Sequence, residues 1–459
     1  MAPLLRACRT VRDLILLFAF VAIIPFIFKR PVVGALAYAL VSLMNPHRMA
    51  YGFAQNFPFA MLLCVITLAA VVISREPKKL PMSPGVLMLL IFFSWTTITT
   101  IFAQMPAAAW SDWDRISKIM LMIFVTIMTV RTRKDVQLLA VVVALSLGFW
   151  GIKSGLFVIF SGGGEGVLGP KASFISDNNT LALALVTITP LLVYLLTQTH
   201  TKWTRRAVLG MAALTALGAI GSYSRGALLG AFMMGFFLWL KSTHKLKTGL
   251  AFLLLVPVVV LSMPEEWMGR MHTIQTYSED ASAMGRINSW QFAVNIANEF
   301  VLGGGPNVFS PYMFMLYAPD PERYYDAHSI YFQIIGEQGY IGLAIFLTMF
   351  AVAWRTGSRV IRFCRGKDDL AWALTLARMC HVSIIGYLTA GAFLTLAYYD
   401  LIYYVMAILI TLEKVLIRLP QKDDIPPMRI PFLQDRIDRW LGKTAATKAP
   451  AGAPASALY

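Results

Sequence analysis

Charged residues are scarce in this chain, and that scarcity decides its broad class. Only 14% of the 459 residues are charged and 58% are apolar, whereas a soluble domain carries about 25% charged residues. Many apolar runs approach the ~20 residues that span hydrocarbon as a helix, and a helix satisfies its own backbone polar groups in lipid. The strict alternation of an outer-membrane barrel is missing. The sequence therefore predicts an all-α polytopic membrane protein.

Several motifs and residue pairings are absent as well. The chain has no Walker motif, Rossmann fingerprint or zinc-binding H-E-x-x-H, which argues against ATP-driven chemistry and against those cofactor sites. Its four cysteines (Cys8, Cys64, Cys364 and Cys380) lack metal-ligand spacing, and we expect no disulfides. The net charge of +16 is spread over short connectors instead of forming one basic patch, so nucleic acid is not an expected partner.

The basic connectors predict a topology. Lysines and arginines gather in every second connector, around 75–79, 131–134, 202–206, 241–247 and 355–367, which assigns that side to the cytoplasm. The segments 14–28 and 31–44 are interpreted together as one broken or re-entrant crossing. About twelve transmembrane helices follow, with both termini inside. The further spans are predicted at 59–73, 85–104, 116–130, 136–160, 180–197, 205–221, 226–240, 248–263, 330–354, 371–396 and 398–417.

Four regions follow from this topology. N-terminal transmembrane helices occupy 1–263, a large periplasmic loop 264–329, C-terminal transmembrane helices 330–417, and a cytoplasmic tail 418–459. Within the loop we expect a helix, Arg286–Phe300, after a break at Gly285. Within the tail, apolar residues among charges predict an interfacial helix over Phe432–Leu441, followed by a disordered end.

Three residues on the predicted periplasmic side are candidates for chemistry. Arg225 follows the polar break 221–224, where an arginine is costly unless it is paired, hydrated or snorkelling. Arg286 offers a planar donor fork that matches phosphate oxygens, although a solvated surface charge is the commoner explanation. His328 directly precedes a span and can accept a proton near neutral pH, although a lone boundary histidine is more often structural.

Other polar groups give weaker signals. Asp112-Trp113-Asp114 has the D-x-D spacing of metal-dependent sugar transferases, but we favour an interfacial stretch before a helix because Trp is enriched there. Glu337 lies within a predicted span and needs a partner. Four further residues could touch sugar at the same surface: Lys171, Asp177, Asn178 and Asn179.

The order of these motifs resembles that of one family. The break before Arg225 is followed by an outer loop with Gly-Arg-x-x-x-Trp at 285–290 and Gly-Gly-Gly-Pro-Asn-Val-Phe at 303–309. The loop ends in Ala-His-Ser-x-Tyr-x-Gln-x-x-Gly-Glu-Gln-Gly-x-x-Gly at 327–342. The individual motifs are short, and their order, spacing and shared sidedness carry the resemblance. The chain resembles the O-antigen ligase and polymerase superfamily of bacterial inner membranes, and most closely its ligases.

The resemblance implies a fold, a reaction and a site. The fold is of the GT-C type. The reaction transfers an O-antigen polysaccharide from undecaprenyl diphosphate to lipid A–core oligosaccharide at the periplasmic face, which completes lipopolysaccharide. It implies an inverting glycosyltransferase that needs no cofactor, metal or nucleotide. Arg225 and Arg286 match the arginines that bind the diphosphate, and His328 matches the catalytic histidine.

Two related functions stay open as alternatives, and a third alternative belongs to a different class of protein. An O-antigen polymerase, or a protein O-oligosaccharyltransferase, would use the same lipid-linked donor with a different acceptor. A secondary transporter would instead show internal repeats and paired charges near the bilayer midplane. We see neither in the sequence.

Overall fold

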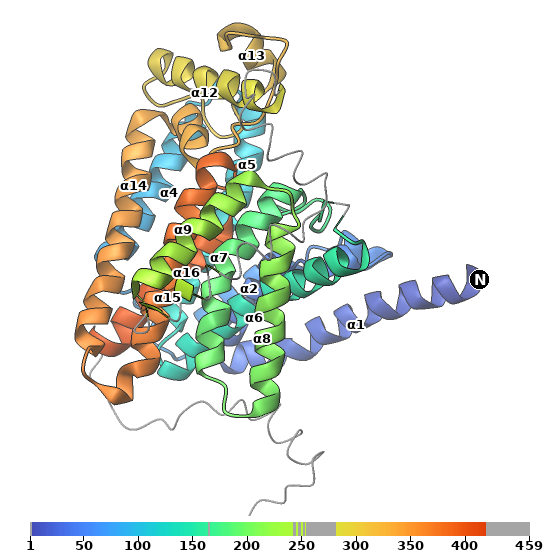
Figure 1. Cartoon of the computed structure of the whole chain (residues 1–459), viewed down its shortest axis with the longest axis vertical. Helices are drawn as coiled ribbons and strands as arrows, with labels where there is room; N and C mark the ends of the chain where they lie inside the picture. The colour runs from blue at the N-terminus through green and yellow to red at the C-terminus, as the bar shows by residue number, and fades with distance from the viewer. Residues whose placement is uncertain are drawn as a thin grey trace, which may run out of the picture. The chain divides into compact units, whose positions relative to one another are not determined.

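The computed structural model describes residues 2–163, 166–241, 245–246, 249–250, 253 and 281–418. In this part of the chain every regular element is a helix (Figure 1). Contacts divide the chain into two units, Met1–Gln421 and Lys422–Tyr459. The second unit, with the expected helix Phe432–Leu441, lies outside the described residues, as does most of the expected 248–263 span.

Local sequence signals explain where many helices begin. Proline occupies a first helical position in α2, α4, α5 and α13, where its missing N–H costs nothing. The side chains of Ser83, Thr132, Asp177 and Thr201 cap the helices that follow them. The helices of the bundle are α1 (Ala2–Lys29), α2 (Pro31–Met44), α3 (Phe59–Ile73), α4 (Pro84–Ile101), α5 (Pro106–Thr129), α6 (Arg133–Phe160), α7 (Asn178–Thr197), α8 (Lys202–Ile220), α9 (Arg225–Lys241), α14 (Ile330–Cys364), α15 (Ala371–Ala390) and α16 (Asp400–Glu413).

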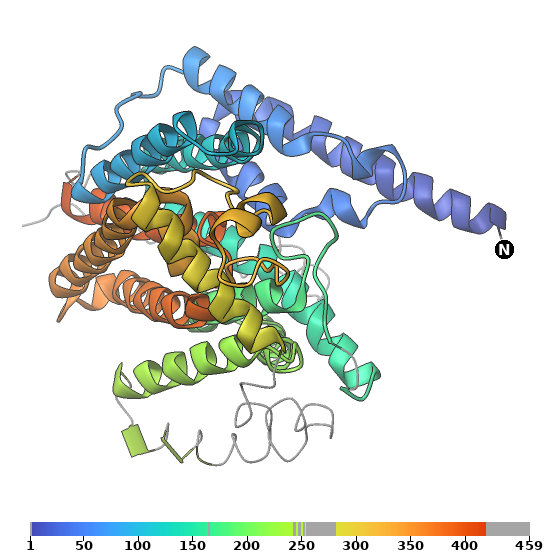
Figure 2. The ribbon, with the colours of Figure 1, turned by 90° about the horizontal axis from the view of Figure 1, so that it is seen from above.

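One longer helix, α12, and several short helices complete the connections. They are η1 (Pro46–Met49), η2 (Phe53–Gln55), α12 (Ala281–Glu299), α13 (Pro311–Tyr317), η3 (Asp368–Leu370), η4 (Gly391–Phe393) and η5 (Lys414–Arg418). Figure 2, seen from above, shows α12 lying across the ends of the bundle helices. The described part of the large loop therefore lies over one end of the bundle.

Length and composition identify the membrane-spanning helices. Six of the described helices are long and apolar enough to cross a bilayer, and three shorter apolar helices accompany them. The chain is a multi-pass membrane protein, while the total of about twelve crossings stays a prediction. The six are Val11–Lys29, Pro84–Ile101, Arg133–Phe160, Asn178–Thr197, Ile330–Cys364 and Asp368–Phe393.

The N-terminal segment, for which we expected one broken or re-entrant crossing, folds as two helices, and its number of crossings stays a prediction. Helices α1 and α2 are antiparallel: Ile27 of α1 packs at Gly34 of α2, whereas Phe20, further back in α1, and Val41, further along α2, pack against one hydrophobic cluster. At the open end of this hairpin, Arg12 donates to the Met49 carbonyl at 3.4 Å. The reason is the single residue between the helices: Arg30 is extended and is followed by proline, which reverses the chain instead of continuing it.

Helix α16 forms the centre of the bundle. All of its residues from Asp400 to Glu413 are buried, and Tyr403 stacks on Phe92 of α4 with ring centroids 6.3 Å apart. By contrast, α1 exposes a long apolar surface that includes Phe18, with 76% of its surface accessible. Such a surface is compatible with a helix that faces lipid.

Candidate active site

One face of α12 fixes the course of the loop segment that leads to His328. Three consecutive side chains of α12 make hydrogen bonds of 2.8–3.0 Å to backbone groups of residues 320–327. Because consecutive helical residues point about 100° apart, this segment wraps around a wide arc of the helix. The bonds run from Asn288 to the Asp320 and Arg323 carbonyls, from the Asp320 N–H to Asn288, from Ser289 to the Tyr325 carbonyl, and from the Trp290 indole to the Ala327 carbonyl.

The predicted helix break at Gly285 is wrong. Helix α12 begins at Ala281 and continues through Gly285 and Arg286 to Glu299, so the arginine lies in the second turn and not at the helix start. A Cβ at Gly285 would lie 2.5 Å from the Tyr325 ring. The glycine therefore permits close approach of the loop and does not end a helix.

His328 has an unusual backbone conformation. Its φ is 42°, in the left-handed region that side-chain-bearing residues rarely adopt. Ser329 follows as the N-cap of α14, with extended backbone. The hydrogen bond from Trp290 to the preceding carbonyl, that of Ala327, measures 2.9 Å and holds the chain at this point. Backbone strain of this kind is often found at functional sites.

Charged groups from three elements act on the His328 imidazole. Burial lowers its pKa below the ordinary value; the Asp326 charge raises it, Arg286 lowers it, and Asp177 raises it. Asp326 is exposed at the surface, yet desolvation by the surrounding protein raises the pKa of its carboxyl. The hydrogen bond from the Ala327 N–H and the charge of His328 lower this pKa. The structure thus brings His328 and Arg286 into one electrostatic environment.

Asp177 enters this environment from the start of α7. Its carboxylate caps the helix, accepting bonds from the Asn179 and Thr180 N–H groups at 2.9 and 3.1 Å. The neighbouring Asn178 donates to the Ser222 carbonyl at 2.8 Å, which joins α7 to the break before Arg225. Sequence alone suggested only that Asp177 faces the same surface, because its effect on His328 depends on folding.

Arg225 begins α9, and contacts through Phe393 connect the start of this helix with Trp290. The adjacent Gly226 packs against Phe393, whose Cβ would lie 2.9 Å from an added Cβ. Phe393 in turn lies 6.5 Å from the Trp290 ring, centroid to centroid. Because Trp290 is one helical turn beyond Arg286, this series of contacts connects the starting turn of α9 with the region of Arg286 and His328.

The motif after His328 has a structural function that sequence reasoning missed. Helix α14 is interrupted at Gly339, which has φ 67°, and Gly303 of the glycine-rich turn packs there: its added Cβ would lie 2.5 Å from the Gly339 nitrogen. The Gly304 and Gly305 N–H groups donate to carbonyls of α14 at 2.8 and 2.9 Å. The two glycine-containing motifs therefore dock the loop on α14.

The same docking supplies partners for Glu337. This buried carboxylate accepts a hydrogen bond from the Asn307 N–H at 3.3 Å and interacts with Tyr398. The next residue, Gln338, donates to Thr96 at 3.0 Å and to Tyr398 at 2.7 Å. Glu337 is thus held in a polar network between the loop, α14 and the start of α16.

The D-x-D carboxylates are in ion pairs with neighbours on their own helix. Asp112 pairs with Arg115 at 3.0 Å, and Asp114 pairs with Lys118 at 2.5 Å. Burial raises the pKa of Asp112, Arg115 lowers it, and the charge of Asp326 raises it. Asp112 therefore lies near the candidate site, although its first partner is an arginine of α5.

Comparison with known protein families gives two matches. Residues 11–200 match DUF5935, a family of unknown function, and residues 210–347 match the O-antigen ligase family model. No curated protein matches the chain. The second match contains Arg225, Arg286 and His328. Members of that family are glycosyltransferase-like ligases, which implies lipid-linked glycans as substrates. The match over residues 210–347 supports an O-antigen ligase type of family for this chain.

Proposed function

We propose that this protein transfers an O-antigen polysaccharide from undecaprenyl diphosphate to a hydroxyl of lipid A–core oligosaccharide at the periplasmic face of the inner membrane. The observation that carries the proposal is the shared environment of His328 and Arg286 inside the matched segment. A base next to a guanidinium suits a reaction that takes a proton from one substrate and expels an anion from the other.

His328 is the general base in this proposal. Its lowered pKa keeps the imidazole neutral at pH 7, so that it can accept the proton of the acceptor hydroxyl. The resulting imidazolium is stabilised by Asp326 and Asp177, because each of these charges favours the protonated form. After transfer the proton returns to solvent or to the released diphosphate.

Arg286 and Arg225 bind the leaving group. The acceptor oxygen forms a bond to the anomeric carbon while the bond from that carbon to the diphosphate oxygen breaks, and the electron pair leaves with undecaprenyl diphosphate. Guanidinium groups donate bidentate hydrogen bonds to phosphate and stabilise the charge that develops on it. The donor already contains its leaving group, so the reaction requires no nucleotide. A direct displacement inverts the anomeric configuration.

Reconstitution tests this proposal. The purified full chain is incubated with lipid-linked O-antigen and lipid A–core, with a chelator and without nucleotide. We expect a lipopolysaccharide product with inverted linkage. Restoration of activity only by Mg²⁺ or Mn²⁺, or a product that retains the donor configuration, would contradict the mechanism.

A strain that lacks this protein distinguishes the proposed ligase from an O-antigen polymerase and from a protein O-oligosaccharyltransferase. Loss of a ligase leaves polymer on the lipid carrier and none on lipid A–core. Loss of a polymerase leaves single repeat units on lipid A–core, and loss of a protein O-oligosaccharyltransferase leaves lipopolysaccharide unchanged. Either of the latter two results would overturn the proposed acceptor.

A further inference from the structure

A pocket lies between α9, α14 and α15 at the end of the bundle remote from His328. Helix α14 starts two residues after His328, is interrupted at Gly339 and continues to Cys364, so that its part beyond the interruption is about 37 Å long at 1.5 Å per residue. The pocket is near its far end, on the side that the basic connectors predict to be cytoplasmic. Its lining includes Phe237, Leu240, Ile361, Arg365, Arg378 and Ile385.

One wall of the pocket is rigid. The ring of His381, which is 4% exposed, stacks on Trp354 with centroids 3.9 Å apart and an angle of 9° between the planes. Its Nε2 lies 3.0 Å from the Trp354 carbonyl oxygen. Gly357 leaves room for this imidazole, since an added Cβ would lie 2.2 Å from Nε2. Two helices are thereby locked together beside a preformed cavity.

The two arginines of the pocket are available to an anion. No acidic side chain in the described part of the chain forms an ion pair with Arg365 or Arg378. Arg365 is exposed and Arg378 is half-buried. Most of the remaining lining is apolar. This combination of two guanidinium groups with an apolar wall matches a molecule that has a phosphate at one end and hydrocarbon at the other.

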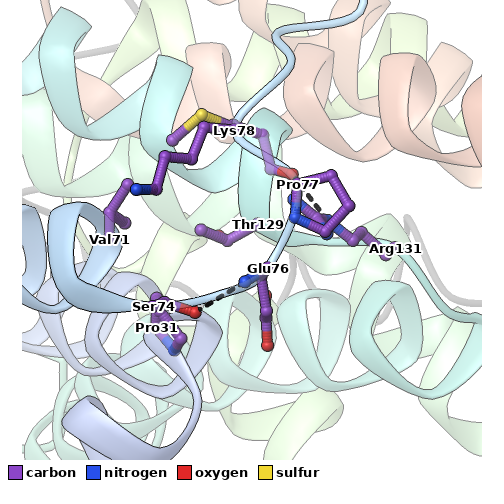
Figure 3. A pocket seen from close by; sticks show the side chains of 9 residues that line it. Pro31, Val71, Ser74, Glu76, Pro77, Lys78, Thr129 and Arg131 are labelled. Atoms are coloured by element: carbon purple, nitrogen blue, oxygen red, sulfur yellow. Dashed lines mark hydrogen bonds between the residues drawn. The ribbon is translucent and has the colours of Figure 1, made fainter.

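A second pocket on the same side, shown in Figure 3, makes a useful contrast. Its cations are already engaged: Lys78 donates to the Val72 carbonyl at 2.6 Å, and the Arg131 Nε donates to the Met128 carbonyl at 3.3 Å. It also contains the carboxylate of Glu76. Of these two pockets, the one between α9, α14 and α15 is therefore the better match for an anion.

We propose that this pocket binds an anionic phospholipid of the cytoplasmic leaflet. Arg365 and Arg378 donate hydrogen bonds to the lipid phosphate, and an acyl chain lies along the apolar residues of α9 and α15. Basic pockets between transmembrane helices on the cytoplasmic side attract anionic headgroups because that leaflet is negatively charged. The site is independent of the proposed glycan transfer.

Native mass spectrometry of the full chain in detergent tests this site, with phosphatidylglycerol as the anionic probe and phosphatidylethanolamine, which is zwitterionic with no net charge, as the comparison. We expect the wild-type protein to retain phosphatidylglycerol preferentially. The double variant Arg365→Gln/Arg378→Gln should need at least about a tenfold higher lipid concentration for equal occupancy, because each charge-assisted hydrogen bond contributes strongly. Arg362→Gln is the matched control: it removes an exposed charge from the last turn of α14 outside the pocket lining.

The outcomes separate the alternatives. Equal retention by the double variant and the wild type, or an equal loss in Arg362→Gln, would overturn the proposal. Displacement by soluble glycerol phosphate at concentrations similar to those of the lipid would overturn the lipid assignment. If the double variant does not fold, Arg365→Gln alone is decisive because its side chain is exposed: a partial loss of retention supports the site, and unchanged retention contradicts it.

Discussion

Trp290→Phe tests whether the loop clamp positions His328. The phenyl ring can still stack on Phe332, whose ring lies 4.8 Å away at an angle of 8°. The indole N–H is lost, however, and with it the 2.9 Å hydrogen bond to the Ala327 carbonyl. Leaving a carbonyl of this kind unsatisfied costs about 1–3 kcal/mol. His328 is the next residue and has a strained backbone. Without the hydrogen bond to Ala327, the chain at this point can relax and the imidazole moves from its position.

If the whole cost appears in the transition state, kcat falls by about 5- to 140-fold, at ~1.4 kcal/mol per factor of ten. We expect KM for the lipid-linked donor to change little, because the diphosphate-binding arginines are retained. The assay is the reconstituted transfer reaction, with thermal unfolding measured in parallel. Trp290 acts in this account as a positioning residue, since it contacts the loop and not the reacting atoms.

Trp150→Phe is the matched control. Its indole donates to the Met44 carbonyl at 2.8 Å, so the substitution removes the same kind of hydrogen bond, here between α6 and the end of α2. Both variants should lose stability, but only Trp290→Phe should lose kcat. If Trp290→Phe unfolds at a lower temperature yet keeps the wild-type kcat, the clamp has no role in catalysis and the reasoning is refuted.

Three further predictions concern charge and packing at the site. The acid limb of the pH–rate profile should lie below the ordinary histidine pKa of about 6.5, because activity needs neutral His328. Since the Arg286 charge lowers the pKa of His328, Arg286→Ala should move the acid limb of the residual activity to higher pH, whereas Arg286→Lys should leave it in place. An unmoved limb in Arg286→Ala would show that the two groups do not interact. Asp326→Asn should shift the same limb to lower pH, since its charge raises the pKa of His328; a shift to higher pH would contradict this. Gly285→Ala should lower the unfolding temperature by several degrees, because the new Cβ meets the Tyr325 ring and overpacking lowers the free energy of unfolding by about 1–3 kcal/mol. Gly210→Ala is the control, because no neighbouring atom lies within 4 Å of a Cβ at that position.

The stability effect of the lowered His328 pKa has a definite sign. The unfolded chain binds a proton at this residue at a higher pH than the folded chain does. The contribution to the free energy of unfolding therefore decreases as the pH falls below about 6.5. His328→Ala should remove this dependence, which chemical denaturation at several pH values would measure.

Much of the helical fold was predictable because membrane helices are encoded locally. An apolar run must hydrogen-bond within itself in lipid, so its length and its polar limits identify the helix. The predicted span 59–73 coincides with α3, and 136–160 differs from α6 only by its first turn. The three candidate residues also came from short local motifs, and their catalytic roles stay predictions.

Contacts between distant segments were decided only by the tertiary structure. The antiparallel course of α1 and α2, the clamp from Asn288 to Trp290, and the approach of Asp177 to His328 each join residues far apart in sequence, and composition and spacing do not encode such pairings. Gly285 illustrates the difference: sequence suggested a helix break, whereas the structure shows a continuous helix against which Tyr325 packs. A glycine is permissive for both, and only the position of its neighbours distinguishes them.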